Sequence, residues 1–218
     1  QGSPRALPLH QRVLVVLGAS LCAAGGWLYL REAKKRAQQA ERQQKLRALA
    51  LGQGDFELQD HAGQPRRKSD FRGRWVLLYF GFTHCPDICP EELEKLSEVV
   101  ALLDEQRPQL PEVQPLFITV DPERDDGAAL RRYLRDFHPR LLGLTGSLEA
   151  VREAGKAFRV YSSLGPKDAE GNYAVDHTVL IYLLGPDGLL RDYYGRSKSS
   201  AHIARSVRQH MESYEPLL

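Results

Sequence analysis

The sequence predicts an α/β domain with a central mixed sheet flanked by helices, preceded by an N-terminal transmembrane helix. Apolar stretches of strand length alternate with segments of helical periodicity, and the series ends in a hairpin and a closing helix. Separately, residues 13–30 form eighteen consecutive positions without a charge. The expected parts are a tail at 1–12, the membrane helix at 13–30, a basic juxtamembrane stalk at 31–51 and one folded domain at 52–218.

The transmembrane prediction rests on length and flanking residues. As a helix, residues 13–30 would span about 27 Å, close to the roughly 30 Å hydrocarbon core of a bilayer. Trp27 and Tyr29 lie at one end, as aromatic residues at a membrane interface do. A secretory signal peptide is the alternative, but its apolar region is normally shorter. Basic residues are more numerous after this stretch than before it, which by the positive-inside rule keeps the domain on the cytoplasmic or matrix side.

Composition excludes several classes of protein. The formal net charge is +2 and the basic residues cluster in the stalk, so no nucleic-acid-binding surface is indicated. Three cysteines are too few for a disulfide-stabilised scaffold. Cys22 lies within the apolar stretch and is interpreted as a small hydrophobic residue.

The folded domain begins near Gly54, with a short apolar segment at 56–58 and a turn at 61–63. The continuous apolar stretch at 75–82 is typical of a strand buried on both faces. Further strands are expected at 116–120, 141–144, 178–184 and 189–194, the last two joined by a turn at 185–188. Helices are expected at 91–103, 128–137, 148–158 and 199–214, and a loop or hairpin at 165–176.

The chemistry is concentrated in a CPDIC sequence directly after the first buried strand. If a helix begins in this loop, Cys85 and Cys89 lie one turn apart on one face. The helix N-terminus would then favour thiolate over thiol. Such a pair can form a disulfide, exchange one or bind a soft metal. A purely structural disulfide is the simpler alternative, although closing so short a loop gains little entropy.

The order of elements, with a dithiol after the first core strand, resembles the thioredoxin-like fold. In that fold the loop before the hairpin lies opposite the dithiol, which would bring His177 to the two sulfurs. Two thiolates and one imidazole form a soft donor set suited to copper, especially Cu(I). A hydrogen-bonded histidine at a strand end is the alternative for His177. His84 is the rival ligand, but neighbouring side chains on an extended segment point to opposite faces, so we expect it to turn away from the thiols.

Four segments carry a closer resemblance: FGFTHCPDICP at 80–90, TVDP at 119–122, VDHT at 175–178 and GPDG at 185–188. Together they resemble the Sco family of membrane-anchored copper metallochaperones in cytochrome c oxidase assembly, with the second vertebrate paralogue as the nearer match. The resemblance implies that Cys85, Cys89 and His177 bind copper, with Cu(I) favoured and Cu(II) left open.

The same resemblance implies partners and a location. They are cytochrome c oxidase subunit II with its binuclear copper site, the other Sco paralogue and a small copper donor of the intermembrane space. The protein would be a single-pass mitochondrial inner-membrane protein with its domain in the intermembrane space, opposite to the charge count above. A homodimer is left open.

Two enzymatic functions are the alternatives. A thiol–disulfide oxidoreductase would use Cys85 and Cys89 as attacking and resolving thiols, and this role is compatible with copper delivery because a target's cysteines must be reduced before loading. Whether the chain is an enzyme in this sense is left open. A peroxiredoxin-like peroxidase ranks last, because Leu78 and Phe82 stand where that class carries proline and threonine.

Overall fold

The structure, a computed structural model, describes residues 8–48, 52–167, 173 and 175–214. The chain divides into two compact units, Gln1–Lys45 and Leu46–Leu218. Helix α1 runs without interruption over Leu9–Ala48, through both the predicted membrane helix and most of the predicted stalk. Among the residues described, no helix has the length and hydropathy needed to cross a membrane. The transmembrane helix at 13–30 therefore stays a prediction.

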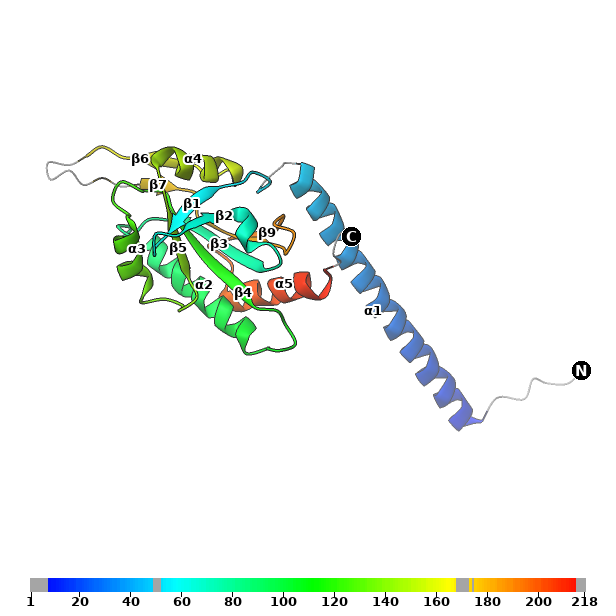
Figure 1. The fold of residues 1–218 in the computed structure, drawn as a ribbon. Coiled ribbons are helices and arrows are strands. Elements are labelled where there is room, and N and C mark those ends of the chain that lie inside the picture. The colour runs from blue at the N-terminus through cyan, green and yellow to red at the C-terminus, as the bar shows by residue number, and fades with distance from the viewer. Residues whose placement is uncertain (1–7, 49–51, 168–172, 174, 215–218) are drawn as a thin grey trace, which may run out of the picture. The chain divides into compact units, whose positions relative to one another are not determined.

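The second unit is built on a mixed sheet, which in the described part of the chain has seven strands in the order β2-β1-β5-β4-β3-β8-β9 (Figure 1). The three central strands β3, β4 and β5 run parallel, and the outer pairs are antiparallel. The strands are β1 (Glu57–Asp60), β2 (Pro65–Arg67), β3 (Trp75–Gly81), β4 (Val113–Thr119), β5 (Leu142–Thr145), β8 (Leu180–Leu184) and β9 (Leu190–Gly195). The predicted α/β class with a mixed central sheet is confirmed.

Helices cover both faces of this sheet. Helices α2, α3 and α5 lie on one face and α4 on the other (Figure 1). Their bounds are α2 (Ile88–Asp104), α3 (Gly127–Leu134), α4 (Leu148–Ala157) and α5 (Ser200–Glu212), with a 3-10 turn η1 (Lys68–Phe71) after β2. Asp126, Ser147 and Ser199 cap α3, α4 and α5, because each side chain accepts a hydrogen bond from the N–H three residues on. All four predicted helices are present.

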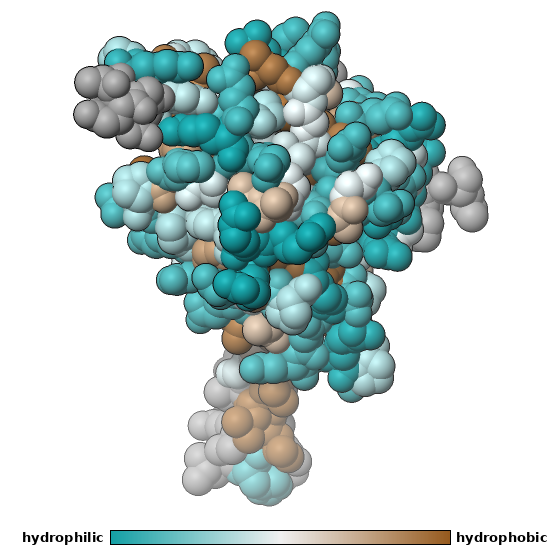
Figure 2. Space-filling view, turned by 60° about the vertical axis from the view of Figure 1, so that its left-hand side comes forward, coloured by the Kyte–Doolittle hydropathy of each residue, from teal (hydrophilic) through white to brown (hydrophobic). Residues whose placement is uncertain are grey.

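Strand β3 lies at the centre of the core. All seven of its residues are buried, because β4 and β8 pair with its two edges and helices cover its faces. Leu78, for example, lies between Leu116 of β4 and Tyr182 of β8. On the side of the folded domain seen in Figure 2, the surface is mostly hydrophilic, with apolar side chains scattered among polar ones.

The main differences from the sequence prediction are short strands. Strand β2 was not predicted, and the expected loop or hairpin at 165–176 is flanked by β6 (Ser162–Leu164) and β7 (Val175–His177), which pair antiparallel. Residues 168–172 and 174 lie outside the described residues. The strand expected from 178 begins at Leu180, and His177 ends β7 instead of lying in a loop. Three-residue strands are too short for an alternating pattern to reveal.

Candidate functional site

The two cysteines lie where β3 leads into α2. Cys89 is in the first turn of α2 and completely buried, whereas Cys85 lies in the preceding loop and is half-buried. The prediction that both stand on one helix face is wrong for Cys85, because α2 begins only at Ile88. The cysteines still meet: the Cys89 N–H donates to the Cys85 Sγ at 3.3 Å. The Cys85 sulfur thus accepts a hydrogen bond from one of the N–H groups that have no partner within the first turn of a helix. Both residues are free thiols.

His177 reaches this pair from β7. Its Nε2 lies 3.4 Å from the Cys89 Sγ, across 88 residues of sequence. Its Nδ1 lies 3.0 Å from the Thr178 carbonyl oxygen, and since a carbonyl only accepts, Nδ1 carries the proton and the Nε2 lone pair faces the sulfur. The Phe82 ring packs edge-on against the imidazole at a centroid distance of 5.7 Å. The expected meeting of His177 with the dithiol is therefore found, through Cys89.

Burial dominates the electrostatics of these two groups. Desolvation raises the pKa of the Cys89 thiol to about 12, so the predicted preference for thiolate at the helix N-terminus is wrong for this residue. Desolvation likewise lowers the pKa of His177, which keeps its imidazole neutral at pH 7. A neutral imidazole and a buried thiol are ready to bind a soft metal ion that takes the place of the thiol proton.

His84 belongs to a different network. Its Nδ1 lies 3.1 Å from the Thr83 hydroxyl and 3.6 Å from a carboxylate oxygen of Asp125. The His84 ring therefore faces these two residues, in agreement with the expectation that it turns away from the thiols. Asp125 is completely buried and accepts from the Thr83 N–H at 2.9 Å and from the Thr83 and Thr119 hydroxyls at 2.5 and 2.7 Å. This carboxylate ties the loop before Cys85 to the end of β4.

Two residues of β3 at the site were not predicted. The Tyr79 hydroxyl donates to the Cys89 Sγ at 3.6 Å. Gly81 leaves room for the same sulfur, because a Cβ built there would lie 2.9 Å from it and 2.8 Å from the Tyr79 ring. Residues two apart on a strand share a face. The YFG sequence at 79–81, shortly before the CPDIC loop, could therefore have placed Tyr79 and Gly81 on the same face of the strand.

Gly81→Ala is expected to damage the site and the fold together. The added methyl group meets the Cys89 sulfur and two aromatic rings below van der Waals distance, and such overpacking costs about 1–3 kcal/mol. Urea unfolding and reaction of the thiols with a disulfide reagent measure the two effects. Gly195→Ala on β9 is the matched control, since its nearest neighbour would be 3.8 Å away. Equal stability and thiol reactivity in the two variants would contradict the close packing at Gly81.

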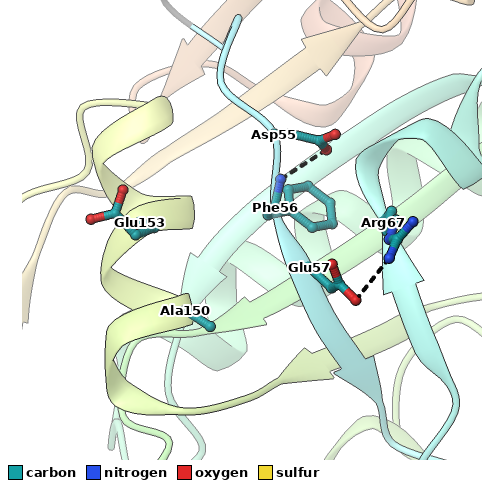
Figure 3. A pocket seen from close by; sticks show the side chains of 6 residues that line it. All are labelled: Asp55, Phe56, Glu57, Arg67, Ala150 and Glu153. Carbon is teal, nitrogen blue, oxygen red and sulfur yellow. Dashed lines mark hydrogen bonds and ion pairs between the residues drawn. The ribbon is translucent and has the colours of Figure 1, made fainter.

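A separate surface pocket of about 430 Å³ lies between β1, β2 and α4 (Figure 3). It is lined by Asp55, Phe56, Glu57, Arg67, Ala150 and Glu153. The Glu57 carboxylate pairs with the Arg67 guanidinium at 3.1 Å. Since the pocket contains neither a thiol nor His177, it is not part of the site described above.

Within the described residues, no three His, Cys, Asp or Glu side chains lie close enough together to hold a metal ion. The Cys89 sulfur contacts the His177 ring directly, whereas the Cys85 sulfur contacts the backbone N–H of Cys89. Cys85 is the most exposed of these three residues.

The comparisons with known proteins match the whole domain. A family profile described as SCO1/SenC matches residues 44–212. The human "Protein SCO2 homolog, mitochondrial" is 58% identical over 220 residues, covering 100% of this chain and 82% of that protein. The human "Protein SCO1 homolog, mitochondrial" is 45% identical over 202 residues, covering 93% of this chain and 66% of that protein. The crystal structure of yeast Sco1 with copper bound is 42% identical with a TM-score of 0.72, covering 76% of this chain and 91% of that one.

Proposed function

Since the chain belongs to the SCO1/SenC family, we propose that it is a copper metallochaperone that binds its cargo through Cys85, Cys89 and His177. The yeast protein similar to this chain has been solved with copper bound. The observation that carries the proposal is the 3.4 Å contact between the Cys89 Sγ and the His177 Nε2, whose lone pair faces the sulfur. Thiolates are ligands that select Cu(I), and an imidazole is a suitable further ligand for copper.

Binding would proceed by exchange of protons for the metal ion. The Cys89 thiol loses its proton as its sulfur bonds to Cu(I), and the neutral imidazole of His177 donates its Nε2 lone pair without losing a proton. Cys85, half-buried in the loop, would complete the set by losing its thiol proton as its sulfur bonds to Cu(I). A set of three donors leaves Cu(I) accessible to a further ligand.

Delivery would follow from that accessibility. A thiolate of the acceptor bonds to Cu(I) as the Cys85 sulfur leaves, and the oxidation state of copper does not change. We propose the binuclear copper site of cytochrome c oxidase subunit II as the acceptor, with the other Sco paralogue and a small intermembrane-space copper donor as partners. Family membership supports this assignment, since a solved Sco protein similar to this chain is described as a member of the Sco family of cytochrome c oxidase assembly proteins.

The location is part of the proposal. Relatives of this chain are named mitochondrial. We propose that residues 13–30 anchor the protein in the inner membrane and that residues 52–218 form a domain in the intermembrane space. The uncharged stretch of eighteen residues and the oxidase subunit proposed as acceptor support this topology.

The proposed function predicts one Cu(I) per chain when the protein is reduced and kept under anaerobic conditions. No Cu(I) should bind after Cys85 and Cys89 are oxidised to a disulfide or alkylated, because neither form offers a thiolate. The measurement is a competition titration against a Cu(I) chelator with a parallel thiol count. Oxidation followed by re-reduction is the control, and it should restore one copper per chain. Undiminished binding by the alkylated protein would place the copper elsewhere.

A further inference from the structure

Tyr79 is a buried residue that contacts both Cys89 and His177. Its side chain is completely buried in β3, and its hydroxyl donates to the Cys89 Sγ at 3.6 Å. Its ring also packs edge-on against the His177 imidazole, at a centroid distance of 6.2 Å and an interplanar angle of 69°. Tyr79 thus supplies a hydrogen-bond donor at the sulfur and an apolar wall beside the imidazole.

A second buried tyrosine shows that this hydrogen bond is not a general property of core tyrosines. Tyr182 on β8 is equally buried, yet none of the residues described offers its hydroxyl a hydrogen-bond partner. Its ring packs against Phe80 and Phe158, at centroid distances of 6.1 and 5.4 Å. The two tyrosines therefore differ in what their hydroxyls contact, and not in how deeply they are buried.

We propose that Tyr79 is a positioning residue whose hydroxyl bonds more strongly to the Cys89 sulfur as that sulfur gains electron density, most of all as a metal-bound thiolate, and so favours the reduced, Cu(I)-binding state of the site. The expected effect on Cu(I) affinity rests on the proposed copper function. The expected effect on the dithiol–disulfide equilibrium rests on the two cysteines alone. A hydrogen bond to a charged acceptor is roughly twice as strong as one between neutral groups. In a buried site this difference grows, because the local dielectric is low.

The charge on the sulfur differs between the states of the site. In the disulfide, the Cys89 sulfur is bonded to the Cys85 sulfur and carries no charge. In the reduced site the sulfur carries its thiol proton, and because this S–H faces the Nε2 lone pair of His177, the sulfur gains partial negative charge. Reduction breaks the S–S bond with two electrons and two protons from an external thiol couple such as glutathione, and loading with Cu(I) replaces the protons by the metal ion. The thiolate bound to Cu(I) keeps much of its negative charge. The Tyr79 hydroxyl therefore stabilises the disulfide least and the copper-bound thiolate most, as hydrogen bonds to metal-bound sulfur do.

The test compares Tyr79→Phe with Tyr182→Phe in the full chain. Each variant keeps its ring and loses one buried hydroxyl, so packing is preserved in both, and thermal unfolding checks that both fold. The dithiol–disulfide equilibrium is measured in glutathione buffers. We expect Tyr79→Phe to shift it about fivefold toward the disulfide, which is about 20 mV for this two-electron couple. Competition with a chelator should show Cu(I) affinity lower by about tenfold. Tyr182→Phe should match the unmodified chain in both assays.

The two measurements, the dithiol–disulfide equilibrium and the Cu(I) affinity, distinguish the proposed copper function from the proposed role of Tyr79. Failure of the unmodified chain to bind Cu(I) would reject the proposed function, while a shifted dithiol equilibrium in Tyr79→Phe would still support the action of Tyr79 on the sulfur. An unchanged equilibrium in Tyr79→Phe, with Cu(I) affinity equal to that of Tyr182→Phe, would overturn the role of Tyr79. Equal shifts in both variants would overturn it as well, since the effect would then belong to any buried hydroxyl.

Discussion

Cys89→Ser is expected to abolish Cu(I) binding under conditions where the unmodified chain binds one equivalent. The substitution removes the sulfur that contacts His177, so the expected loss exceeds the roughly 10- to 100-fold that removal of an outer-shell partner costs. Serine retains a hydroxyl that can accept from Tyr79 and donate to His177, which limits the cost to the fold. The measurement is copper content after anaerobic loading and desalting, with circular dichroism as the test of folding.

Cys22→Ser is the matched control for this experiment. Cys22 is an exposed free thiol on α1, so its loss should leave copper content unchanged. Copper retained by Cys89→Ser but lost by Cys22→Ser would show that the dithiol after β3 is not the binding site.

His177→Ala is expected to weaken Cu(I) binding about 100-fold while thiol–disulfide exchange continues. The imidazole nitrogen is lost as a donor, but both sulfurs remain and can hold Cu(I) with two ligands. Because the imidazole is buried and packs against Phe82 and Tyr79, its truncation should also cost about 1–3 kcal/mol of stability. A chelator titration gives the affinity, thermal unfolding the stability and a glutathione assay the exchange.

His84→Ala is the control for the choice of histidine. His84 is half-exposed and contacts Thr83 and Asp125, so its removal should leave Cu(I) affinity within about twofold of the unmodified chain, as for surface substitutions in general. If His84→Ala lost affinity and a folded His177→Ala did not, the roles of the two histidines would have to be exchanged. If His177→Ala lost exchange but kept copper affinity, the oxidoreductase function would become the better proposal.

The fold class, the helices of the domain and the location of the dithiol directly after the first buried strand could be predicted from the sequence. The apolar stretch that became β3 could be predicted because a strand covered on both faces needs a continuous hydrophobic run. Helix α2 could be predicted because Leu93, Leu96, Val100 and Leu103 recur at helical spacing, and all four are buried. The family could be identified because its short segments around the cysteines and His177 are present in this sequence.

The contacts among the site residues, and the effect of burial on their pKa values, could not be predicted from the sequence because they depend on how distant segments pack. Only packing shows that the His177 Nε2 faces the Cys89 sulfur, that Tyr79 donates to it and that Gly81 leaves room for it. The direction of the pKa shift at Cys89 also depends on the tertiary structure. The helix N-terminus is a local feature readable from sequence, whereas desolvation comes from distant segments that close over the thiol. Desolvation is the larger effect because the thiol is completely buried, so the local expectation was reversed.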